Sequence, residues 1–372
     1  MRKILFMIPT LTGGGAEKIL IDLLQQLDEQ EWSIDLLVLF QKGVYYKQLP
    51  PNVHLLSSNF PQVRGNIHMM KLIPPQKLYR YFVKDQYDVI VSFLEGPTTR
   101  IAAGCPNPET KLINWVHNEF HRLADIGAPY RNIEELLRTY YRFDQTVFVS
   151  ETAKDALLEL IDLPNVKTKV LYNPLNMEKV LKHAVNEKVV AFANNPRQLR
   201  LITIGRLSYQ KGYDRLLNVM AKLIHDDGLD LSLDILGVGE DQKKLQKLAS
   251  TLNLTKQVNF LGFVEQPYIK LAQADAFVCS SRYEGYSTVV TEATLLGVPV
   301  LTTSCSGMSE ILGDSGLITE NNSEAYYQGL RTVLNNPQTL KQLRKKAQLR
   351  GQTLSGRNNA EPIINFLREM SS

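Results

Sequence analysis

The chain has 372 residues, of which 44% are hydrophobic and 22% charged, and its formal net charge is +4. This composition is ordinary for a globular protein, and the length predicts two domains of about 150 to 200 residues each. No run approaches the ~18 apolar residues that cross a bilayer, and the apolar start Ile4–Ile8 is too short for a signal peptide. Three cysteines without metal-ligand spacing are typical of reduced thiols, so the sequence predicts a cytoplasmic protein.

The positive charge is unevenly placed. Between Leu36 and Lys84 there is no acidic residue, and the apolar residues Met69, Met70, Leu72 and Ile73 lie among basic ones: Lys42, Lys47, Arg64, Lys71, Lys77, Arg80 and Lys84. This stretch could rest on an anionic membrane with its apolar side chains inserted. Alternatively, it is a loop and helix whose apolar residues face the core. No recognition motif accompanies the charge, so nucleic acid is not a predicted partner.

The chain begins with a predicted strand, Lys3–Ile8, a glycine loop at 13–15 and a helix over Ile19–Leu27. This order is typical of a doubly wound parallel sheet. Glycines in the loop let backbone N–H groups approach an anion or a sugar closely. The loop does not match G-x-G-x-x-G, and no acidic residue closes the next strand, Asp35–Phe40, so a nicotinamide cofactor is disfavoured.

Helices and strands alternate through the first half, which favours a parallel sheet with ligands at the carboxyl ends of its strands. His117 and Glu95 follow two of these strands. His117 could bond a sugar hydroxyl or a substrate carbonyl, or be a structural hydrogen-bonder; for Glu95 we expect a structural or acceptor-side role. The pattern degrades over Asn176–Arg200, which we interpret as the crossing between domains. The predicted strands are Val53–Leu56, Val89–Phe93, Lys111–Val116, Gln145–Val149 and Val170–Tyr172.

The second half begins with a strand, Leu199–Ile204, a loop at 205–212 and a helix over Tyr213–Ile224. The loop holds Arg206 and, five residues later, Lys211. Two cations on one short loop at the end of a strand predict a cradle for two phosphates, although they could also be solvated surface charges.

The stretch Arg282–Pro299 places Glu284 and Glu292 eight residues apart around a helix start. Ser287 or Thr288 is a natural N-cap, and Gly297 with Pro299 ends the predicted helix, Val289–Leu296. A helix N-terminus between two carboxylates suits a ligand with phosphate in the middle and hydroxyls at both ends. The alternative is an amphipathic surface helix with two solvated glutamates. Further strands are predicted at Leu231–Leu236, Val258–Leu261, Ala276–Cys279 and Val298–Thr302, and a last helix at Ala360–Met370 could pack on either domain.

The glycine loop, His117, the string GRLSYQKG at 205–212 and the E-x7-E spacing occur in the order of glycosyltransferase family 4. Over nearly its whole length the chain resembles this family of retaining GT-B enzymes. The resemblance implies an α/β fold of two Rossmann-like, doubly wound parallel-sheet domains that face a central cleft. Residues 1–175 would form the acceptor-side domain, with the C-terminal helix 358–372 packing back on it, and 176–357 would bind the nucleotide sugar.

The resemblance also implies roles for single residues. Arg206 and Lys211 would hold the donor diphosphate, Glu284 a sugar hydroxyl and Glu292 the ribose; together with His117, the first three form the implied catalytic set. The implied donor-binding residues are Gly14, Gly15, Gly205, Gly262, Phe263, Val264, Gly285, Tyr286, Ser287, Thr288 and Glu292. After the first glutamate the family commonly has G-F-G, and Gly285-Tyr286-Ser287 departs from it, which leaves the donor sugar open.

From the resemblance we expect transfer of a hexose or N-acetylhexosamine, with retention, from a nucleotide diphosphate sugar, on family grounds a UDP-sugar. The expected acceptor is a sugar or lipid-linked saccharide of bacterial surface glycan synthesis. The chain contains no Asp-x-Asp string, so we expect no divalent metal and no other cofactor. A nucleotide-sugar epimerase of the same fold and an inactive donor-binding scaffold of a synthase complex are the alternatives. The sequence does not identify the donor sugar, the acceptor or the oligomeric state.

Overall fold

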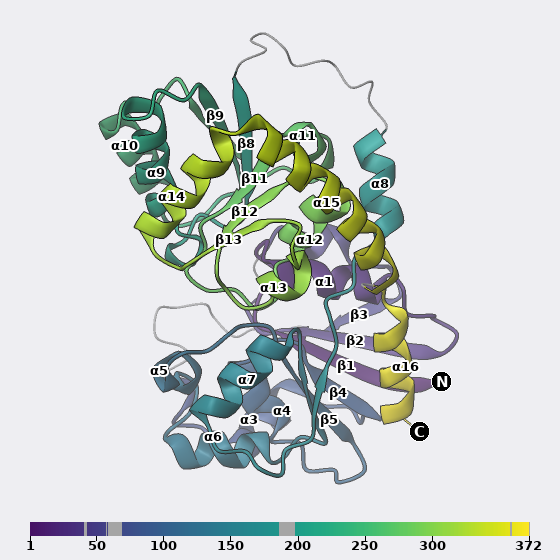
Figure 1. Cartoon of the computed structure of the whole chain (residues 1–372). Helices are drawn as coiled ribbons and strands as arrows, with labels where there is room; N and C mark the ends of the chain where they lie inside the picture. Colours follow the sequence, from purple (N-terminus) through teal and green to yellow (C-terminus); the bar gives the residue numbers. More distant parts are fainter. Residues whose placement is uncertain (41–42, 57, 59–68, 186–197, 358, 372) are drawn as a thin grey trace. The chain divides into compact units, whose positions relative to one another are not determined.

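The computed structural model describes residues 1–40, 43–56, 58, 69–185, 198–357 and 359–371. The chain divides into two compact units, Met1–Leu175 with Asn359–Ser372 and Asn176–Asn358, which we call the first and second units. Figure 1 shows the strands of each unit at its centre, with helices on both faces. No helix in the described part of the chain is long and apolar enough to span a bilayer.

The first unit is built, among the residues described, on seven parallel strands in the order β3-β2-β1-β4-β5-β6-β7. Because β2 and β4 flank β1 on opposite sides, the carboxyl ends of β1 and β4 form a topological switch point. The strands are β1 (Arg2–Ile8), β2 (Trp32–Val38), β3 (Val53–Leu56), β4 (Val89–Ser92), β5 (Lys111–Val116), β6 (Gln145–Phe148) and β7 (Thr168–Val170). The helices include α1 (Gly15–Leu24), α3 (Pro75–Phe82), α4 (Pro97–Ala102), α5 (Leu123–Gly127), α6 (Ile133–Tyr140) and α7 (Glu151–Leu160).

The second unit repeats this plan, with six parallel strands in the described ranges in the order β10-β9-β8-β11-β12-β13. Its switch point lies between β8 and β11. The strands are β8 (Leu199–Ile204), β9 (Leu231–Leu236), β10 (Val258–Gly262), β11 (Ala276–Cys279), β12 (Val300–Thr303) and β13 (Leu317–Thr319). The helices include α8 (Met177–Val185), α9 (Tyr213–His225), α10 (Gln242–Thr251), α11 (Tyr268–Gln273), α12 (Thr288–Leu295), α13 (Met308–Leu312), α14 (Ser323–Leu334) and α15 (Pro337–Arg357). Two doubly wound parallel sheets confirm the predicted fold class.

The last helix, α16 (Glu361–Met370), belongs to the first unit. The guanidinium of Arg368 bonds both carboxylate oxygens of Glu31 at 2.8 to 3.0 Å, and the Lys169 ammonium lies 4.8 Å from the centre of the Phe366 ring. Ile363 and Leu367 are buried on the inner side of the helix. Its amphipathic pattern therefore attaches the end of the chain to the sheet with which the chain begins.

The interpretation of Asn176–Arg200 as the crossing between domains is wrong for its first part. Residues 177–185 form α8, a helix of the second unit in which Val180 is buried and the His183 ring lies 6.3 Å from that of Tyr268. The apolar residues of this segment keep helical spacing, a signal outweighed by the polar break that follows. Residues 186–197 lie outside the described residues. Strand β13 and helices α13, α14 and α15 were not predicted.

Candidate functional site

Two loops meet at the switch point of the second unit. The loop 205–212 follows β8, and the segment 280–287 follows the neighbouring strand β11. The Arg282 N–H donates to Gln210 O at 2.7 Å, and the Ser280 hydroxyl lies 3.0 Å from the carbonyl oxygens of both Lys211 and Gly212. The two strongest motifs of the sequence therefore form one structure.

Glycines allow this close approach. Gly212 has φ +64°, and a Cβ atom there would lie 2.1 Å from the Ser280 carbonyl oxygen. Gly237, after β9, has φ +135°, and its Cβ would lie 2.0 Å from the carbonyl oxygen of Gly205. Any larger residue at either position would push the neighbouring backbone away.

Lys211 and Glu284 form an ion pair across the two loops. The Lys211 Nζ lies 2.5 Å from Glu284 Oε1, and the Ser281 hydroxyl donates to the same oxygen at 2.5 Å. The side chains are 21% and 8% exposed. Burial, the largest single influence, would lower the pKa of Lys211, but the Glu284 carboxylate together with Cys279 and Cys305 raises the pKa overall. Lys211 therefore carries its charge at neutral pH, with further N–H donors for a ligand.

A second pair, which the sequence did not predict, fastens the loop that carries Lys211. The Arg282 guanidinium bonds both oxygens of Asp214 at 2.9 and 2.8 Å and donates to Tyr209 O at 2.7 Å. Its carbon lies 4.0 Å from the centre of the Tyr209 ring. Asp214 stands in the first turn of α9, where an acid is favoured by the helix dipole alone, so nothing in the spacing identified it as a partner of Arg282.

Of the two predicted N-caps, Ser287 holds the position, although its side chain makes no capping hydrogen bond, and α12 begins and ends one residue before the predicted bounds. Glu292 lies more than a turn inside the helix, where its Oε1 is 3.5 Å from the Tyr268 hydroxyl. Glu284 and Glu292 are both buried, at 6% and 3% exposure, which excludes the interpretation of two solvated surface glutamates. Thr288 and Tyr286 are buried as well.

The remaining predicted residues of the second unit lie at the same sheet edge. Gly205 and Arg206 follow β8, and the Arg206 side chain is exposed. Gly262, at the end of β10, has φ +69°; Phe263 and Val264 come next, and the Phe263 ring is 44% exposed. The backbones of Gly285 and Gly307 approach closely, because a Cβ atom added at Gly307 would lie 2.7 Å from the Gly285 carbonyl oxygen. The structure thus places the predicted residues of this unit in the segments that follow β8, β10 and β11, with Glu292 inside α12.

In the first unit, backbone N–H groups of the glycine loop are hydrogen-bonded to a side chain of the protein itself. The buried Glu17 carboxylate accepts the N–H groups of Gly13 and Gly14 at 2.6 and 2.8 Å and the Thr10 hydroxyl at 2.6 Å. An acidic side chain at the third helical position commonly reaches back in this way. The Gly14 amide is therefore already bonded, whereas Gly15 is exposed as the first residue of α1.

His117 follows β5 at the same edge of the first sheet and is buried against the Phe93 ring, with centroids 4.8 Å apart. Among the residues that the structure describes, its Nε2 has no hydrogen-bond partner. Burial lowers the pKa of His117 to about 3, so the ring is neutral at physiological pH.

Glu95, which follows β4, accepts the backbone N–H of His117 at 2.8 Å, and the Asn118 amide donates to the other Glu95 oxygen. Burial raises the pKa of Glu95.

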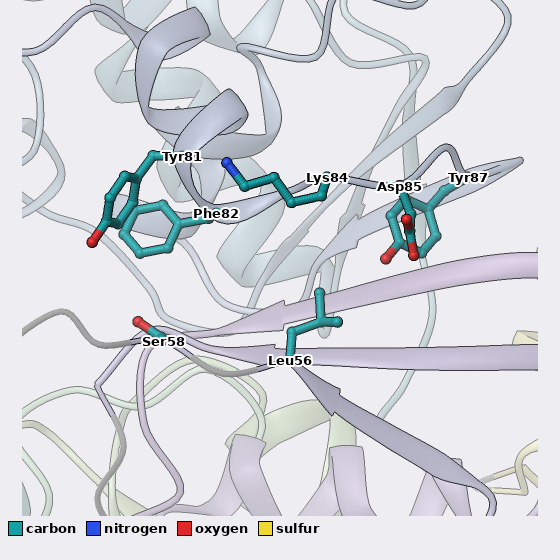
Figure 2. Close-up of a pocket in the computed structure, with 7 residues that line it drawn as sticks. All are labelled: Leu56, Ser58, Tyr81, Phe82, Lys84, Asp85 and Tyr87. Carbon is teal, nitrogen blue, oxygen red and sulfur yellow. The ribbon is translucent and has the colours of Figure 1, made fainter.

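A pocket of about 290 Å³ lies elsewhere in the first unit and contains none of the predicted site residues. Figure 2 shows Tyr81 and Phe82, at the end of α3, across it from Leu56 and Ser58, with Tyr87 at one end. No group of three or more His, Cys, Asp or Glu side chains in the described ranges is arranged to hold a metal ion.

Comparison with known families identifies both halves of the chain. Residues 13–179 match the model described as Glycosyltransferase Family 4, and residues 185–350 match that of glycosyl transferases group 1. The chain belongs to glycosyltransferase family 4. The resemblance predicted from the motifs is thereby confirmed, and the chain is a glycosyltransferase.

Relatives extend over the whole chain. One is the N-acetylgalactosamine-N,N'-diacetylbacillosaminyl-diphospho-undecaprenol 4-alpha-N-acetylgalactosaminyltransferase of Campylobacter jejuni, 26% identical over 386 residues and covering 99% of this chain and 100% of the relative. Among solved structures, HepE of Anabaena in complex with UDP-glucose has a TM-score of 0.73 at 20% identity, covering 99% of each chain. WaaG, a glycosyltransferase involved in lipopolysaccharide biosynthesis, has a TM-score of 0.74 at 15% identity, covering 98% of this chain and 99% of WaaG. The fold is therefore that of the GT-B glycosyltransferases.

Proposed function

We propose that this enzyme transfers a hexose or N-acetylhexosamine from a UDP-sugar to a sugar or lipid-linked saccharide in surface glycan synthesis, with retention at the anomeric carbon. The observation that carries the proposal is the pair of the partly buried Lys211 with the buried Glu284 on two loops that bond to each other. An ammonium held beside a carboxylate suits a ligand in which a diphosphate adjoins hydroxyl groups. A nucleotide diphosphate sugar has that composition.

In the proposed reaction, the bond between the anomeric carbon and the donor phosphate oxygen breaks, and negative charge develops on the leaving diphosphate. Lys211 and Arg206 stabilise that charge, which lowers the barrier only if they are positioned beforehand. The acceptor hydroxyl oxygen forms the new bond on the same face of the sugar, and its proton passes to the leaving phosphate oxygen.

Glu284 supports this front-face route over a double displacement. A double displacement needs a carboxylate that attacks the anomeric carbon. One oxygen of Glu284 already accepts bonds from Lys211 and Ser281, which makes it a weak nucleophile but a well-oriented acceptor for a sugar hydroxyl. We assign Glu284 that role.

The rest of the donor is assigned to neighbouring residues of the same unit. We propose that Glu292 binds the ribose, the segment 262–264 the base, and the backbone of residues 286–288 the sugar and phosphate. His117, Gly14 and Gly15 belong to the first unit, and their part in donor binding stays a prediction. The neutral His117 would act as a hydrogen-bonding group and not as an acid at physiological pH.

Two comparisons support the choice of substrates. HepE was solved with UDP-glucose, which supports a uridine nucleotide. The name of the Campylobacter relative specifies a saccharide on diphospho-undecaprenol, which supports a lipid-linked acceptor. We further propose that the enzyme works without metal, is cytoplasmic, and contacts the inner face of the membrane through the stretch Leu36–Lys84. Residues 41–42 and 59–68, which include Lys42 and Arg64, lie outside the described residues.

The test is a thermal-shift screen across nucleotide sugars, followed by transfer assays with the donor that stabilises the protein. We expect a UDP-sugar to raise the melting temperature, and the product to keep the anomeric configuration of the donor by NMR, with an unchanged rate in chelator. Inversion would refute retention. A new sugar formed from donor alone would instead support an epimerase, and donor binding without hydrolysis or transfer would support a scaffold.

A further inference from the structure

The segment 69–73 of the first unit, which we call the apolar turn, presents apolar side chains to solvent. Leu72 is 81% exposed and Met69 65%, whereas Met70 is 1% exposed. The Leu72 N–H donates to Met69 O and the Ile73 N–H to Met70 O, both at 3.1 Å. Met70 thus anchors a tight turn from which its apolar neighbours project.

Two arginines hold the backbone of the apolar turn. The buried Arg100 donates to Met70 O at 2.8 Å and pairs with Glu135 at 2.8 Å, while Arg131 donates to Lys71 O at 2.6 Å. A buried guanidinium paired with a carboxylate is costly to uncouple. The exposure of Leu72 therefore belongs to the folded arrangement and would cost little ordering on binding a partner.

The charge around the turn is positive. The stretch from Leu36 to Lys84 has no acidic residue, and Lys77 and Arg80 of α3 are exposed. The neighbouring acids of α6 are paired, Glu135 with Arg100 and Glu134 with Arg138. Exposed apolar residues among cations favour an anionic lipid surface as the partner.

Helix α3 contributes cations to this surface, but most of its apolar side chains do not reach it. Its apolar residues Leu78, Tyr79 and Phe82 are buried. The two interpretations of the basic stretch therefore apply to different parts of it: Leu78, Tyr79 and Phe82 of the helix face the core, and Met69, Leu72 and Ile73 of the preceding turn are exposed.

We propose that the apolar turn inserts Leu72, Met69 and Ile73 into the headgroup region of an anionic bilayer, while Lys71 and the cations of α3 lie against lipid phosphates. The contact positions the enzyme at the surface that holds a lipid-linked acceptor; this purpose rests on the proposed function, but the contact itself does not. The turn is the membrane-binding element within the longer basic stretch.

Liposome sedimentation of the full chain tests the proposal, with vesicles of phosphatidylcholine alone and of phosphatidylcholine with phosphatidylglycerol. We expect binding to the anionic vesicles that weakens with salt, and a partition coefficient about tenfold lower for the Leu72→Ser, Ile73→Ser double variant. Leu349→Ser, which changes an exposed leucine of α15, is the matched control and should bind like the wild type. Equal binding by the turn variant, or no lipid-dependent sedimentation of the wild type, would overturn the proposal.

A tryptophan at position 72 gives a second readout. The native tryptophans, Trp32 and Trp115, are buried, so a blue shift on adding anionic vesicles to Leu72→Trp reports the new side chain. An unshifted spectrum while the protein sediments would place the contact elsewhere. Transfer to a water-soluble acceptor without lipid should be the same in wild type and turn variants. Vesicle binding without any transfer would refute the proposed function alone, and transfer without vesicle binding would refute this proposal alone.

Discussion

The Nζ of Lys211 lies 2.5 Å from Oε1 of Glu284, although the two residues belong to separate loops of the second unit. The carboxylate raises the pKa of the partly buried lysine, and the lysine neutralises a buried glutamate whose charge would otherwise be costly to bury. We infer that Glu284 has two roles: it binds the donor sugar, and it holds Lys211 in the state and position needed for the diphosphate.

Replacing Glu284 by Gln should shift the pH dependence of transfer. Without the carboxylate, burial lowers the pKa of Lys211, so the alkaline limb of the kcat/KM profile should move to lower pH. Ser281→Ala removes a hydrogen bond to the same oxygen and no charge, and should lower the rate without moving the limb. An unmoved limb in Glu284→Gln would contradict the role of the pair.

Arg282→Lys should raise the donor KM and lower kcat/KM by about tenfold, because a lysine cannot reproduce the bidentate pair with Asp214 or the stack on Tyr209. The loop that carries Arg206 and Lys211 would lose this attachment and keep the bonds through Ser280. Since Asp214→Asn removes the same pair, the two substitutions combined should cost less than their separate effects added. Additive losses would show that the pair does not position the loop.

The sequence predicts the parts of this site that are continuous along the chain. Loop 205–212 adjoins a recognisable strand, and α12 has an N-cap residue before it and helix-ending residues after it. Which side chains meet across loops depends on the approach of β8 and β11, so the pair of Arg282 with Asp214 was not foreseen. Glu17 was not predicted either: it stands at the third helical position, where an acidic side chain commonly reaches back, and it binds the amides of Gly13 and Gly14.

Acidification should destabilise the fold through His117. The folded chain keeps His117 neutral down to a pKa of about 3, whereas the unfolded chain protonates it near its ordinary value of 6.5. Stability therefore falls as the pH drops from 6.5 towards 3, by roughly 2 kcal/mol between about pH 7.5 and about pH 5. His117→Asn should remove this pH-dependent fall in the free energy of unfolding, which denaturant titrations at the two pH values would measure. His121→Asn, an exposed histidine of the same unit, should retain it; an unchanged loss in His117→Asn would show that His117 is not responsible.

The central claim is that the Lys211 cation drives departure of the nucleotide. Single-turnover transfer by Lys211→Ala tests it, with Lys222→Ala as control, because Lys222 pairs with Glu324 on the surface of the same unit. Lys211→Ala leaves Glu284 buried without its cation, so the double variant with Glu284→Gln provides a form without that unpaired charge. We predict a loss of at least about 100-fold in both Lys211 variants and a wild-type rate in the control. Turnover near the wild-type rate in either cooperatively folded Lys211 variant would contradict the claim.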